Sequence, residues 1–369
     1  MPPSRPRIPL PLVLLALAAL LGAYLLSEQF HAARPAPPPR GPSLLDDGRA
    51  RVYFTTPALV YPDVPTRRPD SPLLAAVLAD LDAARRSVDL AVFDLDLEEI
   101  GAALLRAHER GVVVRLVLDS HNLEAPEMAA LAGRLQQAGV PLRFDRRAPF
   151  MHHKFIVVDR ALVWAGSWNM TANDTYRNHN NMLRLASAPL AERYTAEFEA
   201  MFAGWFGAGK GGAPAQGGTG PIAVFFSPEG GAEAEVLRQV AGARRSIRVL
   251  AFSFTSEPIA AALVARARQG VDVRAVLERQ NAAGRGAMLG VVRAGGVAAL
   301  EDGGCYLLHH KAIVVDERVV ITGSYNFTAG AEHSNDENML VVRDVGVARA
   351  YLEEFERLAA LAQAPMRCG

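Results

Sequence analysis

Two stretches of this chain place the same reactive side chains at the same spacing. MHHKFIVVDRALVWAGSWN begins at Met151, and LHHKAIVVDERVVITGSYN begins at Leu308, 157 residues later. Both read H-x-K-x4-D-x6-G-S-x-N. The shared positions are His152, Lys154, Asp159, Gly166, Ser167 and Asn169 in the first copy, and His309, Lys311, Asp316, Gly323, Ser324 and Asn326 in the second.

These residue types suit chemistry on a phosphodiester. Because such a substrate is anionic and resists attack, a site must neutralise its oxygens, supply a nucleophile and protonate the leaving alkoxide. Two Lys and two Asn can hold the oxygens, and the Ser hydroxyls can add donors. Imidazole near pH 7 can act as nucleophile or as acid. Neither copy contains both a nucleophile and an acid, so the two copies must meet at one site.

Lysine is rare in this chain, which makes its position informative. Of the 39 basic residues 36 are Arg, and the three Lys are Lys154, Lys210 and Lys311. Two of the three lie in the repeated motif, which indicates a site that needs a compact ammonium rather than a planar guanidinium. Neither motif carries the group of carboxylates that Mg²⁺ or Ca²⁺ prefers, so we expect no metal and no cofactor.

The double motif resembles the signature of the phospholipase D superfamily, and the resemblance covers roughly residues 50–360. It implies a metal-independent reaction through a phosphohistidine, in which one His attacks and the other protonates the leaving group. That second His then activates water or an acceptor alcohol. The resemblance makes candidate catalytic residues of His152, Lys154, Asp159, Asn169, His309, Lys311, Asp316 and Asn326, and candidate substrate-binding residues of Ser167 and Ser324.

A parallel stretch follows each motif, NHNNML from Asn178 and NDENML from Asn335, in which Glu337 aligns with Asn180. Members of the superfamily often place an acidic residue here to orient a catalytic imidazole, in some cases across the two halves. If the contact crosses here, Glu337 holds His152 and Asn180 holds His309. A carboxylate partner raises the basicity of an imidazole. We therefore predict that His152 is the nucleophile and His309 the acid, with Glu337 catalytic and Asn180 substrate-binding.

Each motif has strand, turn, strand character. In the first copy the turn is expected at Arg160-Ala161, after the apolar, β-branched run KFIVVD. Asp159 and Asp316 lie at strand ends before turns, where capping or orienting the strand is favoured over direct chemistry.

Strand alternation separates the two adjacent histidines of each motif. In a strand, residues two apart share a face, so His152 and Lys154 point the same way and the neighbouring His153 points oppositely. His153 is therefore interpreted as structural, as is its counterpart in the second copy.

The repetition extends beyond the motifs. Residues 85–119 align without a gap with residues 244–278, at an offset of 159, which indicates a duplicated unit. In each unit short β-branched runs alternate with helical patterns, as in 88–93 and 112–118 against 73–84 and 98–110. Alternation of this kind predicts an α/β fold in which helices cover a central sheet. The fold class expected is two duplicated phospholipase D-type α/β-sandwich repeats that form a pseudo-dimer, with an N-terminal hydrophobic anchor.

The N-terminus is predicted to carry a targeting signal. An uncharged run of 19 residues, Ile8 to Leu26, follows Arg5 and Arg7, which predicts a signal anchor or signal peptide with the body outside the cytoplasm. The body is then membrane-anchored, or secreted if the signal is cleaved. The predicted divisions are 1–27 (signal), 28–49 (Pro-rich linker), 50–206 (first repeat), 207–221 (Gly-rich linker) and 222–364 (second repeat). A disulfide between Cys305 and Cys368 is left open.

Residues 44–369 carry 35 basic and 38 acidic residues, which does not favour a non-specific nucleic-acid binder. The sequence predicts a monomeric phospholipase D-type phosphodiesterase that hydrolyses phospholipids at a membrane to phosphatidic acid. A competing hypothesis is an exported endonuclease, for which nucleic acid is the partner and Arg143, Arg146 and Arg147 form a basic patch. The motifs are also compatible with a cardiolipin synthase-like phosphatidyltransferase and with a catalytically silent binding module.

Overall fold

The computed structural model describes residue 45 and residues 47–57, 70–209 and 220–367. Residues 1–39 and 40–369 form separate units, and the fold below is that of the second unit. The predicted signal segment, most of the Pro-rich linker, the centre of the Gly-rich linker and Cys368 lie outside the described residues. Within the described ranges, no helix has the length and apolar character needed to cross a bilayer. Cys305 is disulfide-bonded.

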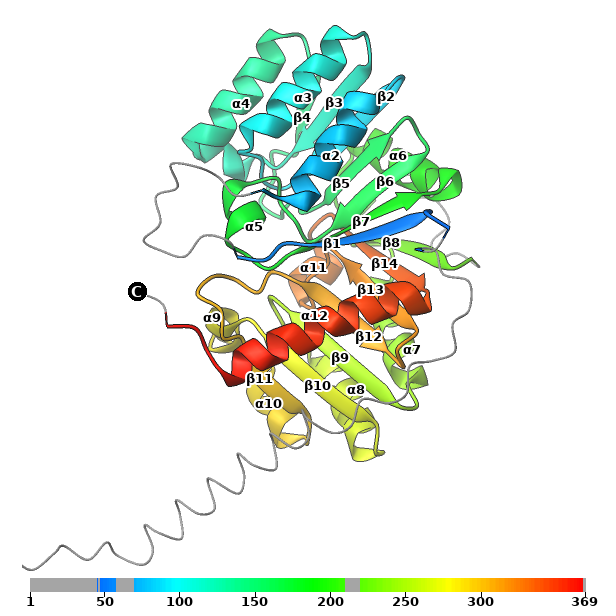
Figure 1. Ribbon diagram of the computed structural model, residues 1–369, viewed down its shortest axis with the longest axis vertical. Helices are drawn as coiled ribbons and strands as arrows, with labels where there is room; N and C mark the ends of the chain where they lie inside the picture. The colour runs from blue at the N-terminus through cyan, green and yellow to red at the C-terminus, as the bar shows by residue number, and fades with distance from the viewer. Residues whose placement is uncertain (1–44, 46, 58–69, 210–219, 368–369) are drawn as a thin grey trace, which may run out of the picture. The chain divides into compact units, whose positions relative to one another are not determined.

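The first repeat is built on a seven-stranded mixed sheet (Figure 1). Its spatial order is β1-β7-β6-β5-β2-β3-β4. The strands β2, β3 and β4 are parallel to one another, and the other neighbours are antiparallel. The strands are β1 (Ala50–Phe54), β2 (Ser87–Val92), β3 (Val113–Leu118), β4 (Leu142–Phe144), β5 (Lys154–Val158), β6 (Leu162–Gly166) and β7 (Asn181–Ala186). The helical segments are α2 (Pro72–Ala83), α3 (Glu98–Glu109), η1 (His121–Glu124), α4 (Pro126–Gln137), α5 (Ala172–Tyr176) and α6 (Ala188–Phe202).

The second repeat reproduces this sheet strand for strand. Its order, β8-β14-β13-β12-β9-β10-β11, matches the first position by position. The strands are β8 (Ile222–Ser227), β9 (Ser246–Ala251), β10 (Asp272–Leu277), β11 (Ala298–Glu301), β12 (Lys311–Val315), β13 (Val319–Gly323) and β14 (Glu337–Arg343). The helices are α7 (Ala232–Gly242), α8 (Glu257–Arg268), α9 (Arg279–Ala282), α10 (Leu289–Ala294), α11 (Ala329–His333) and α12 (Val345–Gln363). The expected duplicated α/β fold is confirmed.

The sequence marks where the main helices begin. At four helix starts a Ser or Asp side chain accepts a hydrogen bond from the backbone N–H three residues on, which satisfies an amide that has no partner inside the helix. A proline follows within two positions at three of these starts, where its missing N–H costs nothing. The capping residues are Ser71, Ser187, Ser256 and Asp344.

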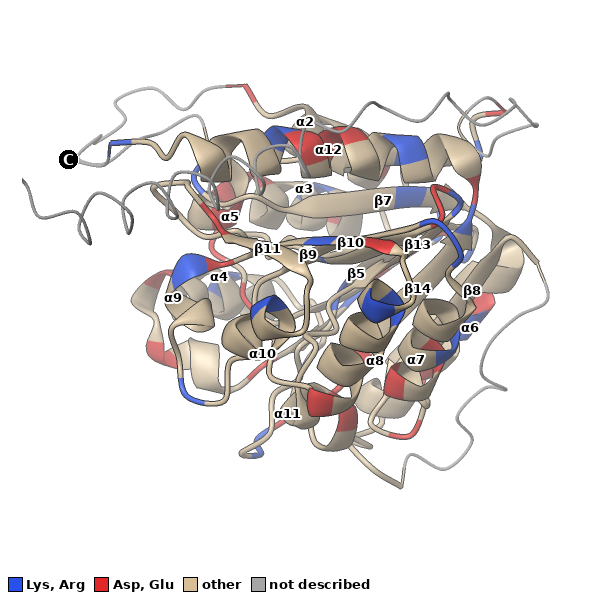
Figure 2. Ribbon diagram, turned by 90° about the horizontal axis from the view of Figure 1, so that it is seen from below, with Lys and Arg blue, Asp and Glu red and all other residues tan. Residues whose placement is uncertain are grey.

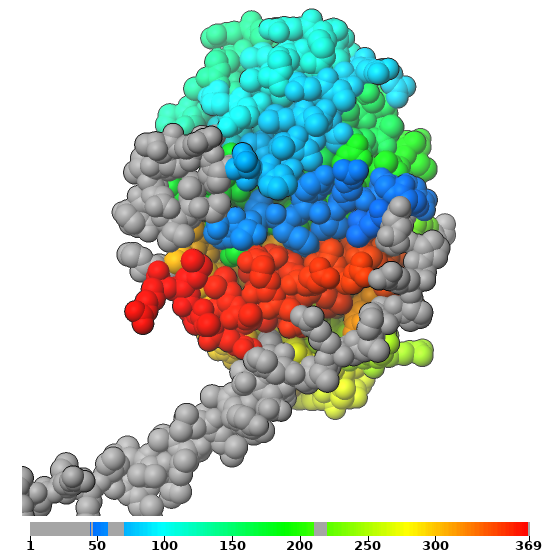
Figure 3. Space-filling model, viewed as in Figure 1, coloured from blue at the N-terminus to red at the C-terminus, as the bar shows by residue number. Residues whose placement is uncertain are grey.

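The two repeats pack through their last helices and first strands. In Figure 3 the surface of α12 lies beside that of β1, although the two are almost 300 residues apart in sequence. The rings of Phe54 on β1 and Tyr351 on α12 meet edge to face at 5.2 Å. The same contact recurs between Tyr194 on α6 and Phe226 on β8, again at 5.2 Å. The last helix of each repeat thus packs on the first strand of the other repeat. This packing brings the two motif strands together.

The hairpin inside each motif turns one residue earlier than the sequence suggests. Asp159 and Arg160 have φ values of 54° and 56°, and Asp316 and Glu317 have values of 50° and 59°. The N–H of Ala161 donates to the backbone oxygen of Val158 at 3.1 Å, and the N–H of Arg318 donates to that of Val315 at 3.0 Å. Each of these β-turns therefore has the two positive-φ residues at its centre, a conformation that Asp tolerates. The expected turn at Arg160-Ala161 is therefore corrected to Asp159-Arg160.

Candidate active site

The motif histidines lie directly before the central strands β5 and β12, and the lysines begin these strands. Lys154 and Lys311 are fully buried. Each Nζ donates to the backbone oxygen of the histidine two residues earlier, at 2.8 Å in both copies. The strand alternation expected from the sequence is present, because each motif histidine is on the same side as its lysine. A buried ammonium next to each imidazole follows from it.

Each catalytic candidate histidine takes its side-chain partner from the other repeat. Nδ1 of His152 lies 2.8 Å from both carboxylate oxygens of Glu337. Nδ1 of His309 lies 2.8 Å from Oδ1 of Asn180, and 3.5 Å from a carboxylate oxygen of Asp174. These are the crossed contacts expected from the aligned stretches. Because an oxygen acceptor occupies each Nδ1, the proton is placed there and Nε2 of both rings is left for chemistry.

Backbone hydrogen bonds tie the two histidine loops together. The N–H of His152 donates to the oxygen of Asp336 at 2.9 Å, and the N–H of Asp336 donates back to Phe150 at 2.9 Å. In the other copy the N–H of His309 donates to the backbone oxygen of His179 at 2.8 Å, and the N–H of His179 donates to the backbone oxygen of Leu307 at 2.9 Å. Asp336 precedes Glu337, and His179 precedes Asn180. The backbone next to each side-chain partner is thus fixed to the loop that carries the imidazole. These backbone bonds hold the two histidine loops against the opposite repeats.

An aromatic ring packs against each histidine–lysine pair. The Phe93 ring lies 4.8 Å from that of His152 and 5.0 Å from Nζ of Lys154. In the second repeat the Phe252 ring lies 4.6 Å from both the His309 ring and Nζ of Lys311. The sequence prediction missed both phenylalanines. The ungapped alignment of the repeats could have identified them, because it places a Phe at this position in both repeats.

The serines of the two motifs hold neighbouring protein groups. Ser167 donates to Oδ1 of Asn180 at 2.9 Å and accepts from the N–H of Asn181 at 3.0 Å. Ser324 accepts from the N–H of Asn338 at 2.9 Å. Both serines are fully buried. In this arrangement both serines position neighbouring protein groups, and their contact with substrate stays a prediction.

The motif asparagines retain unused hydrogen-bonding capacity. Among the described residues, Oδ1 of Asn169 and Oδ1 of Asn326 are buried without a partner. A buried polar atom without a hydrogen bond is costly, and native structures contain few. The two orphaned amides occupy the same position in both motifs. Each orphaned oxygen can accept a hydrogen bond from a donor that enters the site.

Burial has the largest effect on the pKa values of the buried histidines, lysines and Glu337 in the site. It holds the pKa of His152 well below its usual value, with Lys154 and Lys311 adding to the effect, and lowers the pKa of His309 for the same reasons. Burial also lowers the pKa of Lys154 to about 8, lowers that of Lys311, and raises that of Glu337 to about 7. The expectation that Glu337 makes His152 more basic is outweighed by desolvation and by the two ammonium groups.

Asp159 and Asp316 lie at the far ends of β5 and β12, away from the imidazoles. The Asp159 carboxylate accepts the backbone N–H groups of Arg85, Arg86 and Ser87 at 2.7–3.2 Å. Asp316 accepts the equivalent amides of residues 244–246 at 2.7–3.1 Å. The structure separates both aspartates from the other candidate catalytic residues. Their geometry fits the structural interpretation.

The glycines of the two motifs are required by close backbone approach. A Cβ on Gly166 would lie 2.3 Å from the backbone oxygen of Asn181, and one on Gly323 would lie 2.3 Å from that of Asn338. Gly323 also has φ of 146°, which favours glycine. These contacts seat the serine after each glycine against the strand that carries the imidazole partner.

His153 and His310 form a second, buried network across the repeats. Nε2 of His153 lies 3.1 Å from Oε1 of Glu197, and its Nδ1 lies 3.2 Å from Nδ2 of Asn338. Nε2 of His310 lies 3.0 Å from Oε1 of Glu354, and its Nδ1 lies 2.9 Å from Nδ2 of Asn181. Both rings are fully buried. They join α6 and α12 to the opposite repeat, which fits the structural interpretation.

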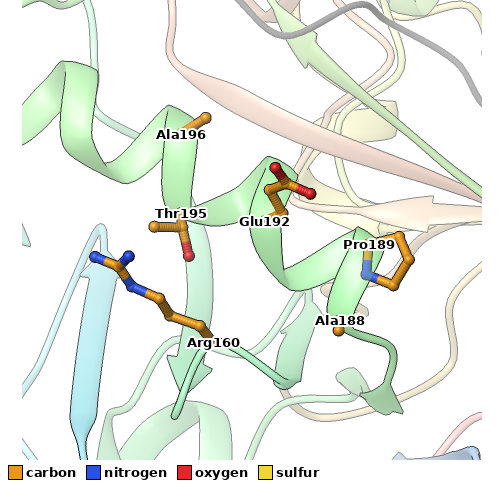
Figure 4. Close-up of a pocket in the computed structure, with 6 residues that line it drawn as sticks. All are labelled: Arg160, Ala188, Pro189, Glu192, Thr195 and Ala196. Carbon is orange, nitrogen blue, oxygen red and sulfur yellow. The ribbon is translucent and has the colours of Figure 1, made fainter.

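A cavity of about 520 Å³ lies elsewhere, at the first turns of α6 (Figure 4). It is lined by Arg160, Ala188, Pro189, Glu192, Thr195 and Ala196 and contains none of the motif histidines, lysines or asparagines. In the part of the chain that the structure describes, no cluster of His, Cys, Asp and Glu could hold a metal ion.

Comparison with known proteins gives consistent matches. The family model described as "Cardiolipin synthase, PLD-like domain" matches residues 77–202 and 236–359. The chain is 42% identical over 123 residues to "Mitochondrial cardiolipin hydrolase" of Xenopus laevis, covering 33% of this chain and 59% of that protein. It is 32% identical over 134 residues to "Phospholipase D" of Rickettsia bellii, covering 36% of this chain and 67% of that protein.

A solved structure matches over most of both chains. The crystal structure of phosphatidylserine synthase from Haemophilus influenzae has a TM-score of 0.64 over 84% of this chain and 86% of its own, at 12% identity. That likeness concerns the fold alone. By sequence, the chain spans little more than half the length of the Xenopus laevis protein, and the match covers one third of the chain.

Proposed function

The chain belongs to the phospholipase D-like family described as cardiolipin synthase, PLD-like domain, and we propose that it is a phosphodiesterase that hydrolyses phospholipids to phosphatidic acid and a free headgroup. The crossed contacts of His152 with Glu337 and of His309 with Asn180 are the observation that carries this proposal. They hold two imidazoles, one from each repeat, with Nε2 of each available beside two buried lysines. This is what displacement at a phosphodiester requires.

The first half of the proposed reaction transfers the phosphatidyl group to the protein. Nε2 of His152 attacks phosphorus, and the bond from phosphorus to the headgroup oxygen breaks. His309 gives its Nε2 proton to the leaving alkoxide, so the headgroup departs as an alcohol. The product is a phosphohistidine on His152. Glu337 accepts a hydrogen bond from Nδ1–H of His152 and stabilises the positive charge that forms on this ring as it attacks.

The second half releases the product. His309, now neutral at Nε2, takes a proton from a water molecule as the water oxygen attacks phosphorus. The phosphorus–nitrogen bond breaks, which returns His152 to its starting form and frees phosphatidic acid. His309 ends protonated, ready for the next substrate. An acceptor alcohol in place of water would give phosphatidyl transfer by the same steps.

The charged groups of the site are proposed to stabilise the transition state. The ammonium groups of Lys154 and Lys311 supply donors for the non-bridging phosphate oxygens, and the side-chain N–H groups of Asn169 and Asn326 can add to them. Before substrate enters, burial disfavours positive charge on both histidines by lowering the pKa of each ring. An entering phosphodiester adds a negative charge and raises the pKa of its neighbours. His309 would therefore gain its proton together with the substrate.

Three observations favour a lipid over a nucleic-acid substrate. The relatives matched by sequence carry the names cardiolipin hydrolase and phospholipase D. Two of the three arginines on which the endonuclease hypothesis depends contact other protein groups. Arg147 forms an ion pair with Asp336, and Arg143 donates to the backbone oxygen of Phe202 at 2.9 Å. Basic and acidic residues are also interspersed over the face in Figure 2 rather than gathered in a basic stripe.

The test is turnover by the full chain, with EDTA present, on mixed phospholipid vesicles and in parallel on single- and double-stranded DNA. We expect phosphatidic acid release that is abolished in His152→Ala and in His309→Ala. DNA cleavage without lipid turnover would overturn the proposal in favour of the endonuclease. Formation of a diphosphatidyl product from added phosphatidylglycerol, in place of phosphatidic acid, would instead identify a phosphatidyltransferase. No turnover on any of these substrates would support the silent binding module.

A further inference from the structure

Large hydrophobic side chains are exposed on this protein at five described positions, and three of them border the loops that carry the catalytic histidines. The three are Phe150, Trp205 and Met366, exposed by 39%, 61% and 40%. We refer to these three side chains as the apolar rim. Aromatic rings bury large areas when they find a partner, and exposed apolar side chains that gather in one place mark interaction sites.

Several contacts connect Phe150 and Trp205 to the first histidine loop. Phe150 is two residues before His152, and their rings lie 6.5 Å apart. The Arg147 guanidinium lies 3.4 Å from the backbone oxygen of Phe150 and 5.9 Å from the ring of Phe206, the neighbour of Trp205. The segment that bears Trp205 therefore lies against the loop that bears Phe150.

Met366 has the corresponding position beside the second histidine loop. Its N–H donates to the backbone oxygen of Gly303 at 2.9 Å, and Gly303 lies in the segment between β11 and His309. That segment is the second repeat's counterpart of the loop that carries Phe150. The apolar rim thus adjoins both histidine loops, one from each repeat.

The exposed charged residues within the segments that carry the apolar rim are basic, and outside these segments the exposed Glu229 accepts the N–H of Gly209 at 2.7 Å. Arg146 is exposed four residues before Phe150, and Arg367 is exposed next to Met366. In the segments 145–150, 203–209 and 364–367, the one acidic residue is Asp145, which is buried. Exposed aromatic and apolar side chains flanked by cationic groups complement an anionic lipid surface, where rings enter the headgroup region and arginines meet phosphates.

We propose that the apolar rim docks the catalytic body on the surface of an anionic phospholipid bilayer, with Trp205 inserted at the headgroup level. This inference rests on the proposed function for the identity of the substrate, and it adds the surface through which the body meets that substrate. Docking here would bring the two histidine loops toward the lipid headgroups. It would also give the body a membrane contact of its own, in addition to the predicted N-terminal anchor.

The tryptophans of this chain provide a direct test. The chain contains three, of which Trp164 and Trp168 are fully buried. The full chain, carrying His152→Ala so that lipid is not consumed, would be reconstituted into vesicles with or without brominated acyl chains. We expect the brominated lipid to quench Trp205, more in equimolar phosphatidylcholine and phosphatidylglycerol than in phosphatidylcholine alone. Trp205→Phe should remove the quenching. Equal emission with and without bromine would overturn the proposal.

A kinetic test separates docking from catalysis. The double variant Trp205→Ser, Met366→Ser should lose roughly tenfold in hydrolysis of anionic vesicles and keep its rate on a short-chain, monomeric phospholipid. Val113→Ser is the matched control, because Val113 is 56% exposed but starts β3 and lies outside the apolar rim. Equal loss on both substrates would contradict docking. No hydrolysis of either substrate by the unaltered chain would instead count against the proposed function, while the quenching experiment would still decide on docking.

Discussion

Glu337 holds Nδ1 of His152 at 2.8 Å from the opposite repeat, and in the mirrored position the neutral Asn180 holds His309 at the same distance. His309 also has a carboxylate oxygen, that of Asp174, 3.5 Å from its Nδ1, so the two imidazoles differ in how closely a carboxylate holds them. The carboxylate hydrogen-bonded to His152 stabilises the cationic ring that forms when an imidazole attacks phosphorus more strongly than the more distant carboxylate beside His309. This difference supports the assignment of His152 as nucleophile.

The two histidines should differ in what can be trapped on them. In His309→Ala, a phospholipid with a good leaving group should still phosphorylate His152, because that leaving group needs no proton. The intermediate should then accumulate, since the base that activates water is missing. Intact-protein mass spectrometry after rapid acid-free quenching would detect the added phosphatidyl group. His152→Ala should carry none, and accumulation in that variant would reverse the two roles.

Replacement of Glu337 by Gln should stabilise the fold above neutral pH and reduce turnover. The pKa of Glu337 is raised to about 7 in the folded state, against about 4.5 when unfolded. The protonated carboxyl therefore favours folding below pH 4.5, and this contribution is lost as the pH rises through 7. The change in unfolding free energy caused by Glu337→Gln should therefore be about 1–3 kcal/mol more favourable to the folded state at pH 8 than at pH 4.

Denaturant unfolding at the two pH values would measure this difference, and kcat should fall by roughly 10²-fold. Asn180→Gln provides the matched control, because the residue in the equivalent position has no charge to titrate. Its effect on the unfolding free energy should be the same at both pH values. A pH-independent effect of Glu337→Gln would show that its carboxyl is not shifted by burial.

Ligand binding should be accompanied by proton uptake. Without a ligand, burial and the two lysines lower the pKa of both His152 and His309, so the rings are neutral at pH 7. An inorganic phosphate or tungstate anion between them would raise these pKa values. Calorimetry at pH 7 in buffers of different ionisation enthalpy should give uptake of up to about one proton per site. Uptake should be lost in His309→Ala, and proton release would contradict the charge balance described.

Asp159 should matter for stability far more than for turnover. Its carboxylate accepts three backbone N–H groups at the end of the sheet away from the imidazoles. Asp159→Ala should lower the unfolding free energy by about 1–3 kcal/mol, because buried or half-buried amides lose their acceptor. The folded variant should keep kcat within about threefold of the unaltered chain. A loss comparable to that of His152→Ala would assign Asp159 to the chemistry.

Much of the site could be predicted from the repeated motif because its geometry is local. Strand alternation placed each lysine beside its histidine, and the aligned stretches paired Glu337 and Asn180 with the opposite imidazoles. The placement of the lysines needed only the period of a β-strand, whereas the pairing of Glu337 and Asn180 rested on the resemblance to the phospholipase D superfamily, in which this contact crosses between the halves of some members. The duplicated α/β fold followed from the same repetition.

The remaining features depend on packing between elements, which periodicity does not describe. The serines face Asn180 and Asn338 because β6 and β13 lie hydrogen-bonded beside β7 and β14. The basicity of His152 was mispredicted because the sequence pairs it with a carboxylate but does not show how near both lysines lie or how little water remains. Phe93 and Phe252 were missed for the same reason.

The crossed partners of the two imidazoles also limit how such a site can arise. If two identical copies of one repeat met at a twofold axis, both imidazoles would have the same partner, either two carboxylates or two amides. Joining the repeats in one chain, with Glu337 in one and Asn180 in the other, lets each position mutate on its own. The covalent link therefore allows one histidine to specialise as nucleophile and the other as acid. A symmetric assembly of identical subunits could not encode this difference.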